Sequence, residues 1–238
     1  MLRKAMEYLQ ELAKPNTIEK DGQLFTDKDV KPVIYNPKAT NIQLTTLSAL
    51  VDYCKSGADS MSKEMFIHIV SPTEVALCST LDAHRKREYL ATVNAMLPVQ
   101  KFNSYIQHEE FCIALQSKFE PMGDRELLLK FAGTVESGSV AEYGDDGITQ
   151  KATIKNGVAS KTDALVPNPV TLYPYRTFLD VFQPASKFVF RMNNSCGVSC
   201  ALFEADGGAW KQQAMESIQK YLEDALAGVE HTKFIILR

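Results

Sequence analysis

Several familiar signatures are missing from this sequence of 238 residues. It contains no apolar run near the roughly 18 residues needed to cross a bilayer, so we expect no membrane partner. The stretch from Met1 to Glu7 lacks the apolar core of a signal peptide and already carries an acid. We therefore expect a cytoplasmic protein rather than a secreted one.

The motifs of common catalytic and nucleotide-binding sites are also absent. The sequence has no GxGxxG or GxxxxGK[ST] phosphate loop, no GxSxG nucleophile elbow and no HExxH metal motif. Internal repeats and low-complexity linkers are missing as well. These absences favour a protein that is not an enzyme, with no catalytic residues and no cofactor.

Cysteine is scarce and scattered, which argues against a disulfide framework. The five cysteines are an odd number, and free thiols in a reducing cytosol explain them most simply. Cys196 and Cys200 form a CxxxC pair, but no second pair or nearby histidine completes a zinc set.

An excess of positive charge is also lacking, because 26 basic residues face 29 acidic ones and the net charge is -3. A general polyanion binder is usually basic. The only dense basic run is His84, Arg85, Lys86 and Arg87. Such a run is typical of a solvated loop, and phosphate contact is the alternative.

What is present is a mixture of helical and strand-like patterns. Helices are expected where apolar residues recur at helical spacing: 2–13, ended by Pro15; 44–54, with a capping box of Thr40 and Gln43; 107–119; 124–132; and a long helix after Gly208 that carries Trp210 to Leu226 and stops at Gly228. Strands are expected where the period is two: Gln23–Phe25, Val33–Tyr35, Met65–Val70, Glu74–Cys78, Glu88–Met96, Thr134–Tyr143, Ile148–Lys155, Val170–Tyr173, Phe178–Val181, Lys187–Met192, Ser199–Phe203 and Phe234–Leu237.

These patterns predict an α+β fold. We expect an antiparallel-rich mixed sheet, several packed helices, and a long C-terminal helix followed by a final strand. The length suits a single domain over residues 1–238, with a division into subdomains 1–120 and 121–238 as the alternative.

Two acids at a strand end invite a metal hypothesis. Glu204 and Asp206 are two residues apart and can share one side of the strand, and Asp180 lies on a neighbouring predicted strand. Three carboxylates could hold Mg²⁺, which takes oxygen ligands. The alternative is that Asp206 caps the following helix and Glu204 pairs with Arg176 or Arg191.

Aromatic residues concentrate around one arginine in the run Tyr173–Phe178. An arginine can stack on a ring while its fork binds a carboxylate or phosphate, which would suit a nucleotide or a single strand. A buried arginine–acid pair among core rings is the alternative. The candidate ligand-binding residues are Tyr175, Arg176, Arg191, Glu204 and Asp206. Gly207-Gly208 before a helix could bind phosphate, but the two adjacent acids favour close backbone packing instead.

The last third resembles a known family. The segments Asp145–Gln150, Pro174–Phe178, Gln183–Ser186 with Phe188–Arg191, and Ala201–Trp210 are similar to those of the YfdQ-like proteins, a phage and prophage family of unknown function. The resemblance covers most of the chain. It implies a phage or prophage protein in the cytoplasm of the bacterial host, and it brings no established catalytic residues.

The functional hypothesis follows from these observations. We expect a non-enzymatic, self-assembling accessory protein, because the signature residues are more easily explained as architecture than as an active site. The amphipathic first helix predicts contact between copies. A host or phage protein or a small molecule is a further expected partner. The alternatives are a nucleic-acid accessory factor using His84–Arg87, and a metal-dependent enzyme using Asp180, Glu204 and Asp206.

Overall fold

The structure, a computed structural model, describes residues 2–20, 23–27, 38–137, 139–145, 150–156, 160–165, 168–193 and 197–238. The chain forms two compact units: an N-terminal unit, Met1–Lys38, and a main unit, Ala39–Arg238. The predicted α+β class is confirmed, including the long C-terminal helix and the final strand. The predicted alternative division near residue 120 stays a prediction. No described helix has the length and apolar character needed to span a bilayer.

The described residues of the N-terminal unit form a helix and a hairpin. Its elements are α1 (Leu2–Ala13), β1 (Thr17–Lys20) and β2 (Gln23–Thr26). The helix stops before Pro15, as predicted, because proline disfavours helix at the residue before it. The backbone N–H of Asn16 donates to Asp27 Oδ1 at 2.8 Å and closes the base of the antiparallel hairpin. The predicted strand Val33–Tyr35 lies outside the described residues.

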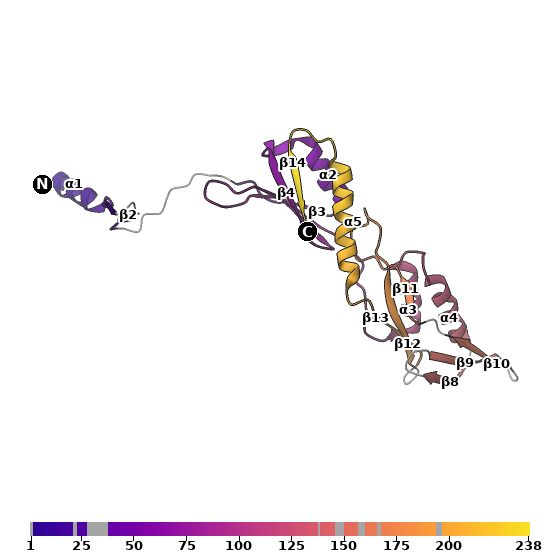
Figure 1. Cartoon of the computed structure of the whole chain (residues 1–238). Coiled ribbons are helices and arrows are strands. Elements are labelled where there is room, and N and C mark those ends of the chain that lie inside the picture. Colours follow the sequence, from indigo (N-terminus) through magenta and orange to yellow (C-terminus); the bar gives the residue numbers. More distant parts are fainter. Residues whose placement is uncertain are drawn as a thin grey trace. The chain divides into compact units, whose positions relative to one another are not determined.

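A five-stranded mixed sheet forms one half of the main unit, in the order β14-β4-β5-β6-β3. Its strands are β3 (Ile42–Leu44), β4 (Glu64–Ser71), β5 (Glu74–Ser79), β6 (Tyr89–Asn94) and β14 (Lys233–Leu237). The three central strands are antiparallel neighbours, and both edge strands pair in parallel. Helices α2 (Leu47–Ser56) and α5 (Ala209–Leu226) pack beside each other and share an apolar core with this sheet (Figure 1). A short 3-10 turn, Ala58–Ser60, follows α2.

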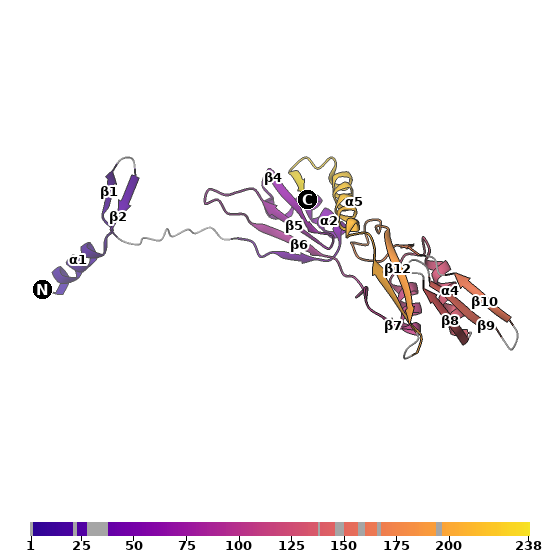
Figure 2. The ribbon, with the colours of Figure 1, turned by 60° about the horizontal axis from the view of Figure 1, so that its bottom comes forward.

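The rest of the main unit contains a four-stranded sheet in the order β11-β12-β13-β7. Its strands are β11 (Val170–Leu172), β12 (Ser186–Asn193), β13 (Ser199–Glu204) and β7 (Ile106–Gln107). Helices α3 (His108–Ser117) and α4 (Arg125–Ser137) pack with it around Phe188 and Phe190. A separate three-stranded sheet contains β8 (Ser139–Asp145), β9 (Gln150–Asn156) and β10 (Ser160–Leu165) (Figure 2).

The predicted strand Phe178–Val181 is wrong, because this segment is a turn. The buried side chain of Gln183 makes hydrogen bonds to backbone groups in and just before this segment. Gln183 Oε1 accepts from the N–H groups of Arg176 (3.0 Å) and Thr177 (3.2 Å), and Nε2 donates to the carbonyl of Phe178 (3.1 Å). Backbone groups that a strand would pair with a neighbour are therefore paired locally.

Two predicted element boundaries are also wrong. The capping box of Thr40 and Gln43 does not start a helix, because residues 42–44 form β3, which pairs with β6. Helix α2 begins at Leu47 with Thr46 as N-cap, whose hydroxyl accepts from the N–H of Ala49 at 3.2 Å. The predicted strand Thr134–Tyr143 starts too early, because α4 continues to Ser137.

Candidate functional site

Arg176 is a buried charged residue of the main unit, only 6% exposed. It lies in the segment between β11 and β12. Its Nη1 donates to Glu204 Oε1 at 2.7 Å, and Nη2 donates to the hydroxyl of Ser186. Asp206 Oδ2 lies 3.8 Å from Nη2. The predicted pairing of Arg176 with an acid is therefore present, and it involves both acids at the end of β13.

Aromatic rings surround the same guanidinium. Its carbon lies 4.0 Å from the centre of the Trp210 ring, 5.7 Å from Phe188 and 5.9 Å from Phe102. An arginine can stack on aromatic rings while its N–H groups bind carboxylates. We call Arg176, Ser186, Glu204, Asp206 and Trp210 the Arg176 cluster.

Several hydrogen-bond donors stabilise the ionised form of Asp206. Burial acts to raise the pKa of this carboxyl, but hydrogen bonds from Ser186 and Gly208 and the charge of Arg176 together lower the pKa below its usual value. The two hydrogen bonds measure 2.6 Å and 3.0 Å. Burial lowers the pKa of Arg176, and Glu204 and Asp206 act against that effect.

Asp206 is not at the N-cap position of α5 that was predicted for it. The N-cap position of α5 is Gly208, which provides no side-chain cap. Asp206 lies two residues earlier and binds the N–H of that glycine. Gly207 and Gly208 both have positive φ, 62° and 82°, which favours glycine here because of the backbone conformation.

A groove of about 670 Å³ opens beside the cluster. It is lined by residues of three segments: Gln100, Phe102 and Asn103 before β7; Arg176 between β11 and β12; and Glu204, Gly207, Gly208, Trp210 and Lys211 from the end of β13 to the start of α5. The volume lies within the range of small-molecule sites. The charges in its wall, including Asp206 behind it, are two positive and two negative.

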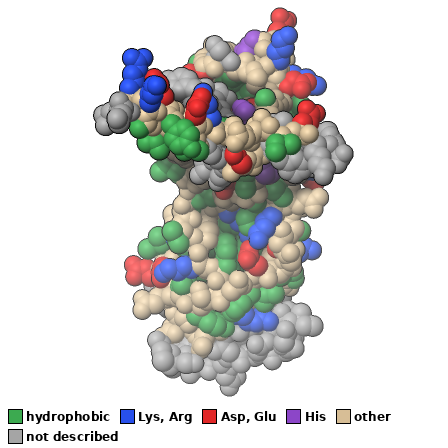
Figure 3. All heavy atoms as spheres, turned by 90° about the vertical axis from the view of Figure 1, so that its left-hand side faces the viewer, with side chains coloured by type: hydrophobic (Ala, Val, Ile, Leu, Met, Phe, Trp, Pro, Cys, Tyr) green, Lys and Arg blue, Asp and Glu red, His purple; other side chains and the backbone are tan. Residues whose placement is uncertain are grey.

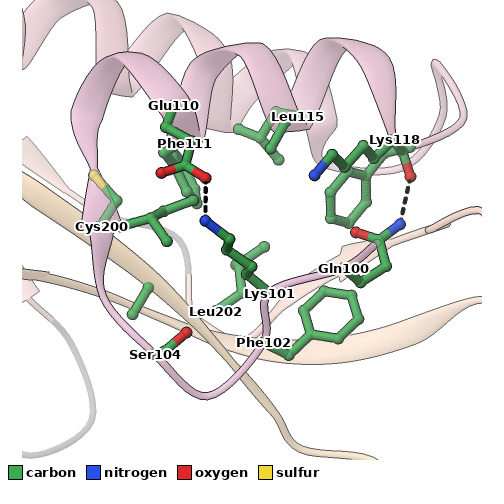
Figure 4. A pocket seen from close by; sticks show the side chains of 14 residues that line it. Gln100, Lys101, Phe102, Ser104, Glu110, Phe111, Leu115, Lys118, Cys200 and Leu202 are labelled. Atoms are coloured by element: carbon green, nitrogen blue, oxygen red, sulfur yellow. Dashed lines mark hydrogen bonds and ion pairs between the residues drawn. The ribbon is translucent and has the colours of Figure 1, made fainter. Parts of the chain in front are cut away.

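A second, enclosed pocket lies between α3 and β13 and has only about 20 Å³ of space. Figure 4 shows Phe111, Leu115, Cys200 and Leu202 around it, with Lys101 and Glu110 joined across its mouth at 2.6 Å. Such a volume holds about one water molecule. This pocket is a packing gap and not a ligand site.

Three predicted ligand-binding residues, Tyr175, Arg191 and Asp206, do not line the groove. Tyr175 lies beside Glu120. The pKa of its phenol is raised, mainly by burial and to a smaller extent by the carboxylate of Glu120. Arg191 directly follows Phe190 on β12. Because successive side chains of a strand point to opposite faces, Arg191 is on the face opposite to Phe188 and Phe190. Its Nη1 donates to the carbonyl of Phe190 at 3.1 Å.

The predicted basic run forms a tight loop. Asp82 Oδ1 accepts from the N–H groups of His84 (2.9 Å) and Lys86 (2.8 Å). His84, Arg85 and Lys86 are exposed, whereas the guanidinium of Arg87 lies 4.6 Å from the Phe66 ring. On the face drawn in Figure 3, basic and acidic side chains are interspersed and do not gather into one basic patch.

The three carboxylates of the metal hypothesis are not brought together. Asp180 does not join Glu204 and Asp206, because its carboxylate accepts from the N–H groups of Leu47 (3.0 Å) and Ser48 (3.1 Å) at the start of α2. Within the described residues, no group of three histidine, cysteine or acidic side chains has the arrangement of a metal site.

The residues that sequence reasoning missed are Ser186, Phe102, Gln100 and Lys211. The stack of Arg176 on Trp210 has no signal in the sequence, because nothing in the spacing of the two residues indicates it. Comparison of the chain with models of known families, with curated proteins and with solved structures gives no match.

Proposed function

We propose that the protein is a non-enzymatic, self-assembling accessory protein, and that its copies are joined through α1. One observation carries the proposal. Every side chain described in the N-terminal unit is exposed, including Met6 at 59%, Leu9 at 63% and Leu12 at 55% on one side of α1. These three side chains recur at a spacing of three residues, which is typical of a buried helical face.

Physical limits on small units support the proposal. An isolated helix shorter than roughly 12–15 residues is marginal in water, and a single two-stranded hairpin is marginal as well. Units below about 40 residues usually need a disulfide, a metal or another chain. A second copy that covers Met6 and Leu9 would provide the missing core.

The Arg176 cluster supports the non-enzymatic part. Glu204 already accepts from Arg176, and Asp206 already accepts from Ser186 and the N–H of Gly208. This arrangement fixes the start of α5 against β13. The family resemblance of the C-terminal segments suggests a phage or prophage origin and the cytoplasm of a bacterial host as the setting.

The test compares two variants of α1 in the full chain. Leu9→Glu places a charge on the apolar side, and Gln10→Glu adds the same charge to the neighbouring residue on the polar side. In light scattering, wild type and Gln10→Glu should exceed the 26.6 kDa of one chain, and Leu9→Glu should return to it. A wild-type monomer, or equal masses for both variants, would overturn the proposal.

A further inference from the structure

The five-stranded sheet of the main unit has a covered face and an open face. On β4, the buried side chains of Met65 and Ile67 belong to the core that this sheet shares with α2 and α5. Because successive side chains of a strand point to opposite faces, Phe66 and His68 lie on the other face. Phe66 is half-buried and His68 is exposed, so this second face is open to solvent.

A shift in strand register places a tyrosine on the open face. The pairing of β5 with β6 moves by one residue between Leu77, which is opposite Ala91, and Cys78, which is opposite Tyr89. Leu90 and Ala91 can therefore both belong to the core. Tyr89 is left on the open face, where 51% of it is exposed.

Two aromatic residues consequently share one row across three strands of the open face. Phe66 on β4 is opposite Cys78 on β5, and Cys78 is opposite Tyr89 on β6. Neighbouring strands are about 4.8 Å apart, so the backbones of Phe66 and Tyr89 are separated by about 10 Å. The central strand contributes only the small side chains of Cys78 and, opposite His68 in the next row, Ala76. Flat ligand groups can therefore reach both aromatic positions.

Arg87 covers the first of these rings. Its guanidinium carbon lies 4.6 Å from the centre of the Phe66 ring, and its Nη1 donates to the carbonyl of Ser79 at 2.9 Å. A nucleic-acid base can stack on an arginine plane as well as on an aromatic ring. The arginine and the phenylalanine together form a stacking surface that is fixed before a ligand arrives.

Cations border the aromatic row. The loop 80–88 joins β5 to β6 next to Tyr89, and it carries three cations and two acids. Arg85 and Lys86 are exposed. Asp82 and Glu88, the two acids, both accept hydrogen bonds from backbone N–H groups.

The other acids of this face do not cancel that charge. Glu64, at the start of β4, forms an ion pair with Lys233 on β14 at 3.1 Å. Glu74 begins β5 and pairs with Asn94, at the end of the strand away from Cys78. The surroundings of the aromatic row are therefore positive, although the whole chain has a net charge of -3.

From this juxtaposition we propose that the open face of the five-stranded sheet binds a single-stranded nucleic acid. Its bases stack on Tyr89 and on the Arg87 plane, and its phosphates contact Arg85 and Lys86. Stacking surfaces combined with cations are the usual means of holding a single strand. A protein partner could also cover the aromatic residues, but it gives no reason for the row of cations beside them. The proposal goes beyond self-assembly and does not depend on it.

Fluorescence anisotropy of a dye-labelled oligonucleotide tests the proposal with the full-length protein. A single strand of about ten nucleotides, made once as RNA and once as DNA of the same sequence, should bind saturably at low salt. The tighter of the two strands identifies the natural class of ligand. The duplex of that sequence should bind at least about tenfold more weakly, because its bases are already stacked on one another. No saturable binding of either strand, or equal binding of the duplex, would overturn the proposal.

A matched pair of tyrosine variants tests the stacking. Tyr89→Ala removes the ring on the open face, and Tyr105→Ala removes another exposed tyrosine of the main unit, before β7. The loss of one stacked base should weaken binding of the single strand about tenfold in Tyr89→Ala and leave Tyr105→Ala like wild type. Equal affinities of the two variants would contradict the proposed surface.

The salt dependence of binding tests the phosphate contacts. Lys86→Gln removes an exposed cation of the loop, and Lys220→Gln removes an exposed cation of α5. Each lost phosphate contact should reduce the slope of the logarithm of affinity against the logarithm of salt concentration by about 0.7. The slope should fall in Lys86→Gln and stay that of wild type in Lys220→Gln. The same slope in both variants would show that the loop does not contact the strand, and it would contradict the proposal.

Discussion

The guanidinium carbon of Arg176 lies 4.0 Å from the centre of the Trp210 ring. This contact joins the segment after β11 to the first turn of α5, and Glu204 brings the end of β13 to the same place. One buried cation therefore connects the segment after β11 to the end of β13 and the start of α5, which follow each other in the sequence. The position of the groove beside them depends on this connection.

Removal of that cation should destabilise the main unit. Arg176→Met leaves Glu204 and Asp206 without their counter-charge, and breaking a largely buried pair in this way costs about 3 kcal/mol. Arg176→Lys should cost less, since the charge remains while the planar fork and the stack are lost. Urea unfolding measures both variants. The control Lys187→Met, an exposed position on β12, should unfold like wild type, and a similar loss there would contradict the role of Arg176.

Acid should remove the contribution of Asp206. Its folded-state pKa is below the ordinary value, so its stabilisation is complete above that ordinary value and disappears as the pH falls through the folded-state pKa. The difference in unfolding free energy between wild type and Asp206→Asn should therefore be constant near neutral pH and shrink below about pH 4. Asp224→Asn, an exposed control on α5, should not change the acid limb. A pH-independent difference for Asp206→Asn would contradict the assignment.

The carboxylate of Asp180 should stabilise α2 from outside the helix. It accepts from two N–H groups of the first turn, which otherwise lack partners within the helix. Asp180→Ala should lower the unfolding free energy by about 1–2 kcal/mol, the usual loss of a helix cap. Asp52→Ala, at an exposed position on the same helix, serves as the control. Equal effects of the two substitutions would show that Asp180 is not a cap.

The described cysteines should differ sharply in reactivity. Burial raises the pKa of the Cys54 thiol to about 12. The pKa of the Cys200 thiol is also raised to about 12, mainly by burial and to a smaller extent by Cys112. At pH 8 the thiolate that reacts with a maleimide is therefore scarce at both positions. Mass spectrometry of the labelled native protein should find Cys112, which is half-buried, modified before Cys54 and Cys200. Comparable labelling rates at the three positions would contradict their described environments.

Periodicity was sufficient for most elements, and it failed where side chains replace backbone partners. The alternation in β4 and β5 and the helical spacing in α5 each reflect one buried face, so local sequence determines them. The segment Phe178–Val181 has the composition of a strand. However, Gln183 binds the carbonyl of Phe178, and Asp180 binds the N–H of Leu47 in α2. Residue spacing does not predict either hydrogen bond. Tertiary hydrogen bonds therefore overrode the propensity of that segment.

The candidate site shows the same limit. The pairing of Arg176 with Glu204 was among the predictions, because charges at the end of a strand need partners when they are buried. Its stack on Trp210 and its contact with Phe102 join segments separated by tens of residues, so only the fold brings them together. For the same reason the three carboxylates of the metal hypothesis do not come together, since that of Asp180 binds the first N–H groups of α2.

The mass of the full-length particle tests the central claim most directly. Sedimentation equilibrium at several loading concentrations should give a wild-type average mass above 26.6 kDa, which decreases toward the mass of one chain on dilution. A single mass of 26.6 kDa at every concentration would contradict assembly through α1.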